Sequence, residues 1–449
     1  MPNKLTNAGF YILRSFKIRP LLSTENEAEG DFGNFVEVSK TITNWAMSES
    51  MNSPFLSGTA VIQETDNILE DLPIVGEEEC EITYTDFYGD TRTDIFFIYS
   101  VENVKPASTI NDRMLTYSIN FCSRQKLFSD QKEVKKSYAN TRISDMVREI
   151  YDSYFLTGNK DLDKEIEIEE TDGEQTLVIP CLRADAAMQF LSRRAYSSLS
   201  KSSLFKFFET RDKYYFCTHE HLIRNKADFG ELSEEERNRL FFMYNTVDDN
   251  TGDGQLIAQQ SISGVNYGTK VNTMTDMKRG GYRKTVTELD IASRTRITRS
   301  YDYTTEFKDM DMPEKLKLTH SEDFVNTFMS PVDAPETVLV TDFPQIGMPK
   351  GNLNQRKPYQ HYYENYTTKP IVDYHMQRNA FKISINGREK LYPGDIINLS
   401  LYKFSHTVAA TREIDHERSG NYIVTAISHE FSGDNYKQIL TITKGGLVA

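Results

Sequence analysis

Two distant segments of this 449-residue chain follow the same local plan. Each starts with a Pro and Gly breaker before an alternating strand, continues through a loop into a second strand, and closes with a third. The matching pieces are 72–86 and 391–403, 96–102 and 422–428, and 114–121 and 438–444. The shared order and spacing predict two similar β modules. Identity between them is low, so two unrelated β-meanders remain an alternative explanation.

Alternation of apolar and polar residues dominates the rest of the sequence, and this period of two is typical of β-strands. Within the first module, strands are predicted at 35–45, 59–63, 79–85, 95–101 and 115–121. Within the second, they are predicted at 256–265, 268–276, 381–385, 395–402, 422–428 and 438–443. The predicted fold class is therefore mainly β with some α.

A mixed α/β region separates the two modules. A helix is predicted at 141–155, with Asn140 or Thr141 as its cap and an apolar stripe along one face. A second helix is predicted at 183–197, and a hairpin joins 204–208 to 213–218. In KEIEIEE, 164–170, strict alternation places three glutamates on one face, which we expect to be a solvated outer face; these are Glu165, Glu167 and Glu169.

These patterns divide the chain into four parts. The first tube-like β-barrel module is expected at 1–130 and the mixed α/β domain at 131–255. The second module is expected to be split between 256–290 and 380–449 by an insertion domain at 291–379. The insertion is irregular in pattern, contains the basic residues Arg294, Arg296 and Arg299, and ends in a predicted helix at 367–379. The polar, acidic stretch 225–255 is expected to be a surface loop with a short helix.

The charge balance argues against tight nucleic-acid binding. Asp and Glu outnumber Lys and Arg by 66 to 52, giving a formal charge of −14. Proteins that neutralise phosphates need the opposite excess, because their affinity comes from cationic contacts and counterion release.

The sequence lacks signs of secretion, membrane insertion or a disulfide framework. No apolar run reaches the roughly 18 residues of a membrane span, and the first 20 residues contain no signal-peptide core. Cys80, Cys122, Cys181 and Cys217 are far apart and show no zinc spacing, so we expect small buried apolar side chains. Synthesis and assembly in the cytoplasm are predicted.

Two short motifs were weighed as metal sites. His219 and His221 would share one face of a strand, but no third ligand is identifiable. Residues 248–254 resemble a calcium loop, yet Gln260 stands where a bidentate Glu is needed. No nucleotide-binding loop or nucleophile elbow occurs, and His429 is expected to have a structural role. The sequence therefore assigns no catalytic, cofactor-binding or metal-binding residue, and the protein is predicted not to be an enzyme.

Several stretches together resemble the central hub proteins of contractile-tailed bacteriophage baseplates, a family related to the spike-hub proteins of type VI secretion. They are FVEVSKTITNWAMSESMNSPFLSGTAVIQETD, the two predicted helices, and LYPGDIINLSLY through SGNYIVTAISHEFSGDNYKQILTITK. The closing stretch is the most specific, since it combines Pro393-Gly394 with Tyr422, His429 and Tyr436. The acidic stretch 225–255 departs from the compact phage form.

The resemblance implies a homotrimer in which two modules per chain make a pseudo-sixfold ring. Such a ring would join a sixfold tail tube or tube-initiator protein to a threefold central spike, which can itself have lysozyme activity. Baseplate wedge proteins would surround it, and DNA would pass through it in the virion. The alternatives are a hub of another contractile injection or type VI system, a glycan- or receptor-binding tail module, and a glycosidase or peptidase.

The ring model also predicts the charge of its channel. DNA slides most easily past an acidic wall, because a basic wall would hold it by counterion release. Candidates for such a wall flank the two breakers: Glu77, Glu78, Glu79, Glu81 and Asp395. The alternative is that these carboxylates only solvate the outer surface.

Overall fold

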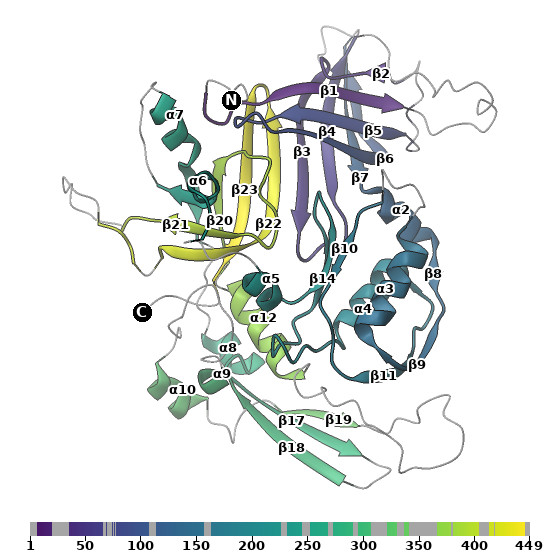
Figure 1. Cartoon of the computed structure of the whole chain (residues 1–449), viewed down its shortest axis with the longest axis vertical. Coiled ribbons are helices and arrows are strands. Elements are labelled where there is room, and N and C mark those ends of the chain that lie inside the picture. The colour runs from purple at the N-terminus through teal and green to yellow at the C-terminus, as the bar shows by residue number, and fades with distance from the viewer. Residues whose placement is uncertain are drawn as a thin grey trace.

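The fold was taken from a computed structural model of the whole chain (Figure 1). The structure describes residues 7–19, 36–65, 69, 74, 76, 78–106, 114–156, 163–225, 231–244, 252–267, 273–290, 295–306, 321–329, 336–340, 366–378, 380–403, 413–416 and 418–444. Strands dominate these residues and several short helices accompany them, as the sequence predicted.

A 13-stranded sheet forms the body of the molecule, and its strands come from both ends of the chain. The path runs in the order β16-β20-β23-β22-β3-β4-β7-β6-β5-β1-β2, with β21 joining β22 and β15 joining β21. From the amino-terminal part come β1 (Ile12–Arg19), β2 (Val36–Glu37), β3 (Ile42–Ser50), β4 (Ser57–Glu64), β5 (Glu79–Thr85), β6 (Thr91–Pro106) and β7 (Leu115–Cys122). The later strands are β15 (Phe241–Met243), β16 (Ile262–Asn266), β20 (Phe381–Asn386), β21 (Ile396–Ser400), β22 (Gly420–Ser432) and β23 (Asn435–Thr443).

One order of antiparallel pairing occurs twice in this sheet. The first run is β5-β6-β7-β4-β3, and the second is β21-β22-β23-β20-β16. In each run the strand after the breaker and the two strands that follow it in the chain are neighbours in the same order: β5, β6 and β7 in the first run, and β21, β22 and β23 in the second. The breakers also agree, because Gly76 and Gly394 both have a positive φ, of 96° and 95°.

The two runs share two of their register shifts, and a further shift of β6 between Glu102 and Lys105 has no counterpart in β22. The register shifts by one residue at Tyr99 of β6, where β6 pairs with β7, and at Thr425 of β22, where β22 pairs with β23. It shifts again at Thr43 of β3 and at Ser263 of β16. When Phe97 is matched with Ile423 and residues are counted along the paired strands, Tyr99 coincides with Thr425 and Thr43 coincides with Ser263. A bulge is a local feature that simple alternation does not require, so two coincident bulges argue against chance.

Each run bends at its long strand. In Figure 1, β1 and β5 cross the direction of β3 and β4, and β21 crosses the direction of β22 and β23. The first half of β6 pairs with β5 and the second half with β7 alone, so the bulge at Tyr99 lies where the strand changes neighbours. The apolar faces enclose two cores, one around Phe16, Ile82 and Ile119 and the other around Ile383, Val424 and Leu440.

The two runs are joined edge to edge within the chain. β22 pairs with β3 from Ala426–Ser50 to Ser432–Asn44. Trp45 stacks on Phe431 across this join with ring centroids 3.7 Å apart, an arrangement that adds about 0.5–1.5 kcal/mol beyond the buried area. The sheet therefore continues without a break from one run to the other.

The mixed α/β region lies against one end of the first run and has its own core of aromatic and aliphatic side chains. It contains α2 (Arg124–Gln131), α3 (Ile143–Tyr154), α4 (Ala184–Ser192), α5 (His219–Asn225) and the strands β8 (Glu133–Val134), β9 (Ser137–Arg142), β10 (Ile166–Ile168), β11 (Glu174–Val178), β12 (Leu182–Arg183), β13 (Lys206–Glu209) and β14 (Tyr214–Cys217). The hairpin prediction is confirmed by β13 and β14, which pair antiparallel.

Both predicted helices of this region are confirmed, with shorter bounds. The apolar stripe of α3 is buried as expected. The N-cap position of α3 is Arg142 rather than Asn140 or Thr141, because β9 continues to Arg142, and no side chain caps the helix. Helix α4 ends at Ser192 instead of continuing to 197, although Ala195 is buried as predicted.

Several strand boundaries were wrong. β1 was missed, and the strand predicted at 35–45 is interrupted by a turn between β2 and β3. Of the strand predicted at 256–265 only β16 is correct, because Gly252–Gln259 forms helix α7. The strand predicted at 268–276 is contradicted by α8 (Thr273–Arg279). A short stretch between turn residues is compatible with either a strand or a short helix, and tertiary contacts decided between them.

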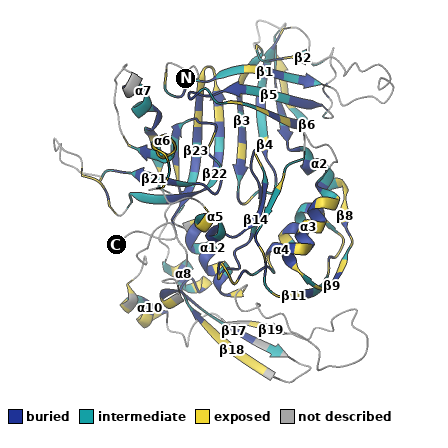
Figure 2. Ribbon diagram, viewed as in Figure 1, coloured by how far each residue is buried: buried dark blue, intermediate teal, exposed yellow. Residues whose placement is uncertain are grey.

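A separate three-stranded sheet comes from the middle of the chain. β17 (Arg283–Asp290) pairs with β18 (Thr295–Asp302) and in parallel with β19 (Glu336–Val340). Thus β17, which was grouped with the second module, pairs with strands from 291–379. Helices α9 (Tyr303–Glu306), α10 (Glu322–Phe328) and α12 (Thr368–Arg378) lie near this sheet, and α6 (Glu234–Leu240) is the short helix expected in the acidic stretch. Figure 2 shows many exposed residues on β18 and α10.

None of the helices in these described ranges is long and apolar enough to span a membrane.

Candidate functional site

A buried ionic cluster lies where the two runs and the mixed α/β region meet. We call it the Arg211 cluster; its members are Glu49, Tyr84, Arg211, Glu389 and His429. Glu49 is on β3 and His429 is on β22, so the join between the runs places them together. Arg211 comes from the turn between β13 and β14 and enters from the mixed region. Glu49, Arg211 and His429 are almost completely buried.

The central contacts are ionic and well formed. Glu49 accepts a hydrogen bond from Nε of Arg211 at 3.1 Å, and its carboxylate lies 2.9 Å from Nε2 of His429. The backbone N–H of Arg211 also donates to Glu49 at 3.2 Å. A buried carboxylate is tolerated only when it is paired and hydrogen-bonded. Glu49 meets that condition through both partners.

Arg211 connects all three parts of the chain through its remaining donors. Nη1 donates to the hydroxyl of Tyr84 at 2.8 Å, in the first run. Nη2 donates to the carbonyl oxygens of Glu389 at 2.5 Å and Leu391 at 3.2 Å, in the segment before β21. One guanidinium therefore fixes the relative positions of the two runs and the mixed region.

Arg92 on β6 extends the cluster toward the surface. Its guanidinium donates to Asp94 at 2.7 Å, Asp212 at 2.6 Å and Glu389 at 3.1 Å. It also donates to the carbonyl of Arg211 at 2.6 Å. These contacts tie the turn that carries Arg211 to both runs.

Charge and burial set the protonation states of the cluster. Burial alone would raise the pKa of Glu49, but the positive charge of Arg211 and the hydrogen bond with His429 outweigh it and hold that pKa below its usual value. Burial lowers the pKa of His429, and the charge of Arg211 lowers it further despite the opposing effect of Glu49. A neutral imidazole between a carboxylate and a hydroxyl is therefore expected at neutral pH.

A chain of polar groups supports His429 from behind. Its Nδ1 lies 2.7 Å from the hydroxyl of Tyr436, which donates to the carbonyl of Arg388 at 3.1 Å. Gln438 donates to the same carbonyl at 2.8 Å. Gly387 lies against the ring of Tyr436, and a Cβ at Gly387 would come within 2.2 Å of that ring. The structural role predicted for His429 agrees with these contacts.

A pocket of ≈ 650 Å³ opens beside the cluster between β6 and the mixed region. Lys164 and Glu209 pair at its wall: Lys164 donates to Glu209 at 2.6 Å, and Glu209 also accepts from Ser123 at 2.5 Å and from the Leu56 N–H at 3.0 Å. These contacts connect the mixed region to β4, which begins next to Leu56.

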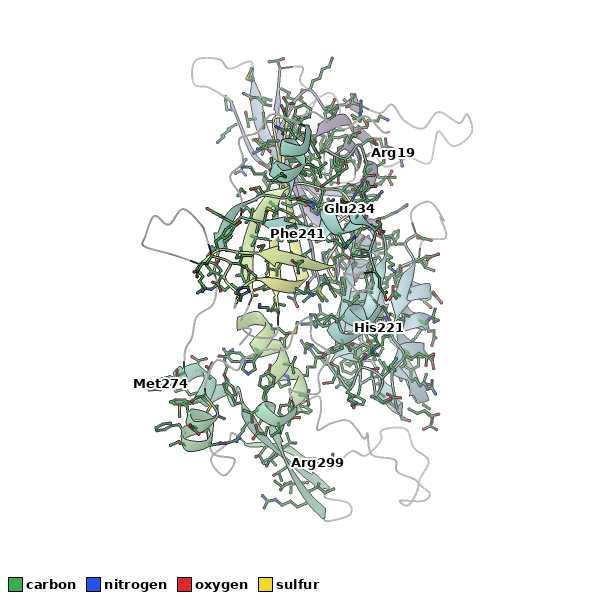
Figure 3. The ribbon with its side chains drawn as sticks, turned by 60° about the vertical axis from the view of Figure 1, so that its left-hand side comes forward. Arg19, His221, Glu234, Phe241, Met274 and Arg299 are labelled. Carbon is green, nitrogen blue, oxygen red and sulfur yellow. The ribbon has the colours of Figure 1, made fainter. Side chains whose placement is uncertain are left out.

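The two histidines considered as metal ligands do not share a strand face. His219 begins helix α5, where it is buried, and burial together with the charge of Lys206 lowers its pKa to about 3. His221 contacts Glu167 at 3.1 Å and Asn225 at 2.8 Å. The strand reading was wrong because β14 ends at Cys217 and the chain turns into a helix. Figure 3 shows His221 beside the mixed α/β region.

The expectation of a solvated face on KEIEIEE was also wrong for two of its three glutamates. Glu169 is buried and accepts hydrogen bonds from the N–H and hydroxyl of Thr218, both at 2.8 Å. Glu167 is half-buried and forms an ion pair with Lys213. Only Glu165 is exposed. Parallel pairing of β10 with β14 brings these carboxylates against the next strand, which alternation alone does not reveal.

Among the residues that the structure describes, no group of three or more His, Cys, Asp and Glu side chains could hold a metal ion. Residues 248–251 of the calcium-like motif lie outside those residues, and Gly252 already belongs to α7. The cysteines are unpaired; Cys80, Cys122 and Cys217 are buried as expected, whereas Cys181 is exposed.

The carboxylates considered for a channel wall are mostly engaged within the chain. Glu78 is buried and accepts from the Gly76 N–H at 3.0 Å, and Asp395 is largely buried and accepts from the Tyr392 N–H at 2.8 Å. Glu79 forms an ion pair with Arg19, and Glu81 lies 3.1 Å from Lys17. Glu77 lies outside the described residues. Of the basic residues in the insertion, Arg296 and Arg299 are exposed on β18, and Arg294 is outside the described part. Figure 3 shows Arg299 far from Arg19.

The Arg211 cluster was not found from the sequence, although one signal was present. Trp45, Met47 and Glu49 alternate on the same face of β3, and that face is buried. A glutamate at a core-facing position requires a buried cation or several donors. The sequence does not say which cation, because Arg211 is 162 residues away.

Two solved structures of tail proteins have a similar fold. A tail protein from Neisseria meningitidis superposes with a TM-score of 0.51 at 12% identity, covering 97% of this chain and 96% of that one. A tail protein of prophage MuSo2 from Shewanella oneidensis gives a TM-score of 0.51 at 7% identity, covering 96% and 98%. A component of the Escherichia coli type VI secretion system gives 0.42 at 9% identity, covering 90% and 73%.

No protein-family model matches the sequence, and no curated protein matches it. The likeness to the two tail proteins therefore concerns the fold, which they share over nearly the full length of all three chains.

Proposed function

We propose that this chain is the structural hub of a contractile phage-tail baseplate and forms a homotrimeric ring with pseudo-sixfold symmetry. The observation that carries the proposal is the repeated strand order with coincident bulges in a single chain. Three such chains around an axis present six similar modules, so a threefold assembly can make near-matched contacts with a sixfold partner.

The likeness to a tail protein of Neisseria meningitidis and to a tail protein of prophage MuSo2 supports this proposal, since the fold is shared over nearly the full length of the chains. In the proposal each run is a tube-like β-barrel module, the first within 1–130 and the second within 256–290 and 380–449, apart from β17, which pairs with strands of the insertion. The mixed α/β domain at 131–255 braces the join through Arg211. The domain at 291–379 is the insertion that splits the second module.

The proposed partners follow from the resemblance to baseplate hub proteins together with the symmetry of the ring. A tail tube or tube-initiator ring binds above, a trimeric central spike binds below, and wedge proteins surround the ring. The protein assembles in the host cytoplasm and resides in the virion tail. The buried ion pairs of the Arg211 cluster suit this role, because they fix the two runs and the mixed region relative to one another.

A structural rather than enzymatic role is part of the same proposal. Beside the pocket, Lys164 pairs with Glu209 and Arg92 pairs with Asp94 and Asp212, at 2.6–2.7 Å. Catalytic acids and bases instead have pKa values shifted toward the pH at which they act, and ion-paired groups of this kind are typical of a structural role. A cell-wall lysis assay with the purified protein is expected to show no activity, and lysis that survives purification to homogeneity would contradict this part.

The proposed channel lets DNA pass without binding it, so its wall should be acidic or neutral. Glu79 and Glu81 are offset by Arg19 and Lys17, and we therefore expect other carboxylates to contribute most of the negative potential. An electron-microscopy map of the assembled ring would locate the wall, and a lining composed mainly of Lys and Arg would contradict free sliding.

Native mass spectrometry combined with projection images of the purified protein tests the ring directly. Three copies of the 51.8 kDa chain with six similar peripheral lobes are expected. A hexamer of whole chains, or a monomer in an assembled baseplate, would refute the proposal.

A further inference from the structure

Two strand edges of the large sheet have no neighbouring strand among the described residues. β6 pairs with β5 through Thr91–Phe97, but from Ser100 to Pro106 it pairs only with β7. β16 pairs only with β20 along its length. Unpaired N–H and C=O groups along an edge are a template for another strand.

The counterparts of these two edges are already joined within the chain. The coincident bulges match β6 with β22 and β16 with β3, so Ser100 corresponds to Ala426. The outer edge of β22 from Ala426 onward pairs with the outer edge of β3. The outer edge of β22 is therefore occupied whereas that of its counterpart β6 is open, and the outer edge of β3 is occupied whereas that of its counterpart β16 is open.

The registers of β6 with β7 and of β22 with β23 fix which residues correspond, also beyond the extra shift of β6 between Glu102 and Lys105. Lys105 lies opposite Thr116 and Glu430 lies opposite Lys437, and these partners occupy the same place on β7 and β23. On the other side, Asn266 lies opposite Lys382 as Ala46 lies opposite Thr59. Within the chain, Glu430 is paired directly with Ala46.

Burial distinguishes the occupied edge from the open one. On β22, Ile427, His429 and Phe431 are buried beneath the join with β3. On β6 the corresponding stretch is uncovered: Val101 is half-buried, Val104 is 51% exposed and Pro106 is exposed. The same contrast holds on the partner side, where Trp45 and Met47 are buried and their counterparts Val265 and Tyr267 are half-buried.

We propose that β6 of one copy pairs antiparallel with β16 of the next copy, in the register that joins β22 to β3 within the chain. Lys105 of one copy then lies opposite the Asn266 position of its neighbour, as Glu430 lies opposite Ala46. The occupant of each open edge is a second copy of this chain. The edge of β22 is occupied by β3, and a second copy supplies β16, the counterpart of β3, to the open edge of β6.

This pairing deepens the ring proposed above and rests on it. The contact is heterologous, since a different edge is used on each copy, and heterologous contacts close into a ring when the rotation permits. Internal and intermolecular joins would alternate around the ring. Six equivalent steps then close at three chains, and each chain contributes one β6 edge and one β16 edge.

A paired-cysteine experiment on the full chain tests the register. The background is Cys181→Ser, which removes the exposed thiol. The test variant adds Lys105→Cys and Asn266→Cys, and the matched control adds Ala46→Cys and Glu430→Cys. Directly opposed antiparallel residues lie about 4.5–5.5 Å apart between Cα atoms, within the span of a disulfide. Single-cysteine variants control for random oxidation.

The two pairs have distinct expected products after mild oxidation. The control should form its disulfide within the chain and run at the monomer mass in a non-reducing denaturing gel. The test variant should give covalent species up to and including the trimer, which disappear on reduction. Neither single-cysteine variant should give a trimer. Native mass spectrometry of the same samples reports assembly independently of the disulfide.

The outcomes separate this inference from the ring itself. A trimer in native mass spectrometry whose test variant forms no intermolecular disulfide, while the control pair oxidises, would overturn the β6–β16 contact and leave the ring proposal standing. A monomer at all concentrations would overturn both. Covalent trimers in the test variant support the contact.

Discussion

Replacing Arg211 with Met is expected to loosen the join between the two runs more than any other change of a single charged residue in the Arg211 cluster. The substitution keeps most of the side-chain volume but removes donors to Glu49, Tyr84 and two carbonyl oxygens. Glu49 would remain buried with His429 as its principal partner. Removing one member of a buried ion pair costs about 3–5 kcal/mol, because the other charge is left without compensation.

Hydrogen exchange read by mass spectrometry measures this cost locally, which matters because a chain of several domains has no single unfolding free energy. At about 1.4 kcal/mol per factor of ten, exchange in peptides from β3 and β22 should accelerate by about a hundredfold to several thousandfold. Peptides from β18 should change little, since β18 belongs to a separate sheet.

The loss should depend on pH in a defined direction. Burial and the charge of Arg211 both lower the pKa of His429 in the parent protein, so removing that charge is expected to raise this pKa relative to the parent. Protonation of the imidazole at low pH then destabilises the folded variant less than it destabilises the folded parent, and this difference vanishes at a pH where the imidazole is neutral in both. The variant should therefore be closer to the parent protein at about pH 5.5 than at about pH 8, which lie roughly one unit below and one to two units above the usual His pKa.

The double variant Glu49→Gln with Arg211→Met is the control for uncompensated charge. Removing both charges should recover part of the loss, since replacing a buried pair costs less than breaking it. Unchanged exchange in β3 and β22 of the single variant would refute the view that Arg211 holds the two runs together.

Three further outcomes follow from individual side chains. Burial, together with the charge of Lys206, lowers the pKa of Lys369 to about 7. Between that pH and the usual Lys pKa the unfolded chain binds more protons than the folded chain, so the buried lysine costs most stability at the lower pH. Lys369→Met should therefore stabilise the protein more at pH 7 than at pH 10 in thermal melts. Gly387→Ala should lower stability by about 1–3 kcal/mol in denaturant titrations because the new methyl group displaces the ring of Tyr436, whereas Gly433→Ala, with open space around the Cβ position, should show only the backbone strain of its positive φ. Cys181 should react rapidly with a maleimide in the native protein and the other three cysteines only after denaturation, and rapid labelling of all four would contradict their burial.

The sequence determined the local plan of the two runs well. The strand at Glu79–Thr85 matched its prediction at both ends, and the hairpin formed by β13 and β14 was also expected. Alternation, breakers and turn residues are local properties, so they can be read from one stretch of chain at a time. The helix α3 belongs to the same class, because its apolar stripe repeats every three to four residues.

Only the tertiary structure decided how these pieces meet. The coincident bulges, the edge join of β22 with β3, and the partners of Glu49 depend on residues that are far apart in the chain. Glu167 and Glu169 show why: alternation placed them on one face correctly, but the side of the sheet that is buried depends on β14 and on Ser200 and Thr218. A pattern of period two states which residues share a face, and only the neighbouring elements determine whether that face meets water or protein.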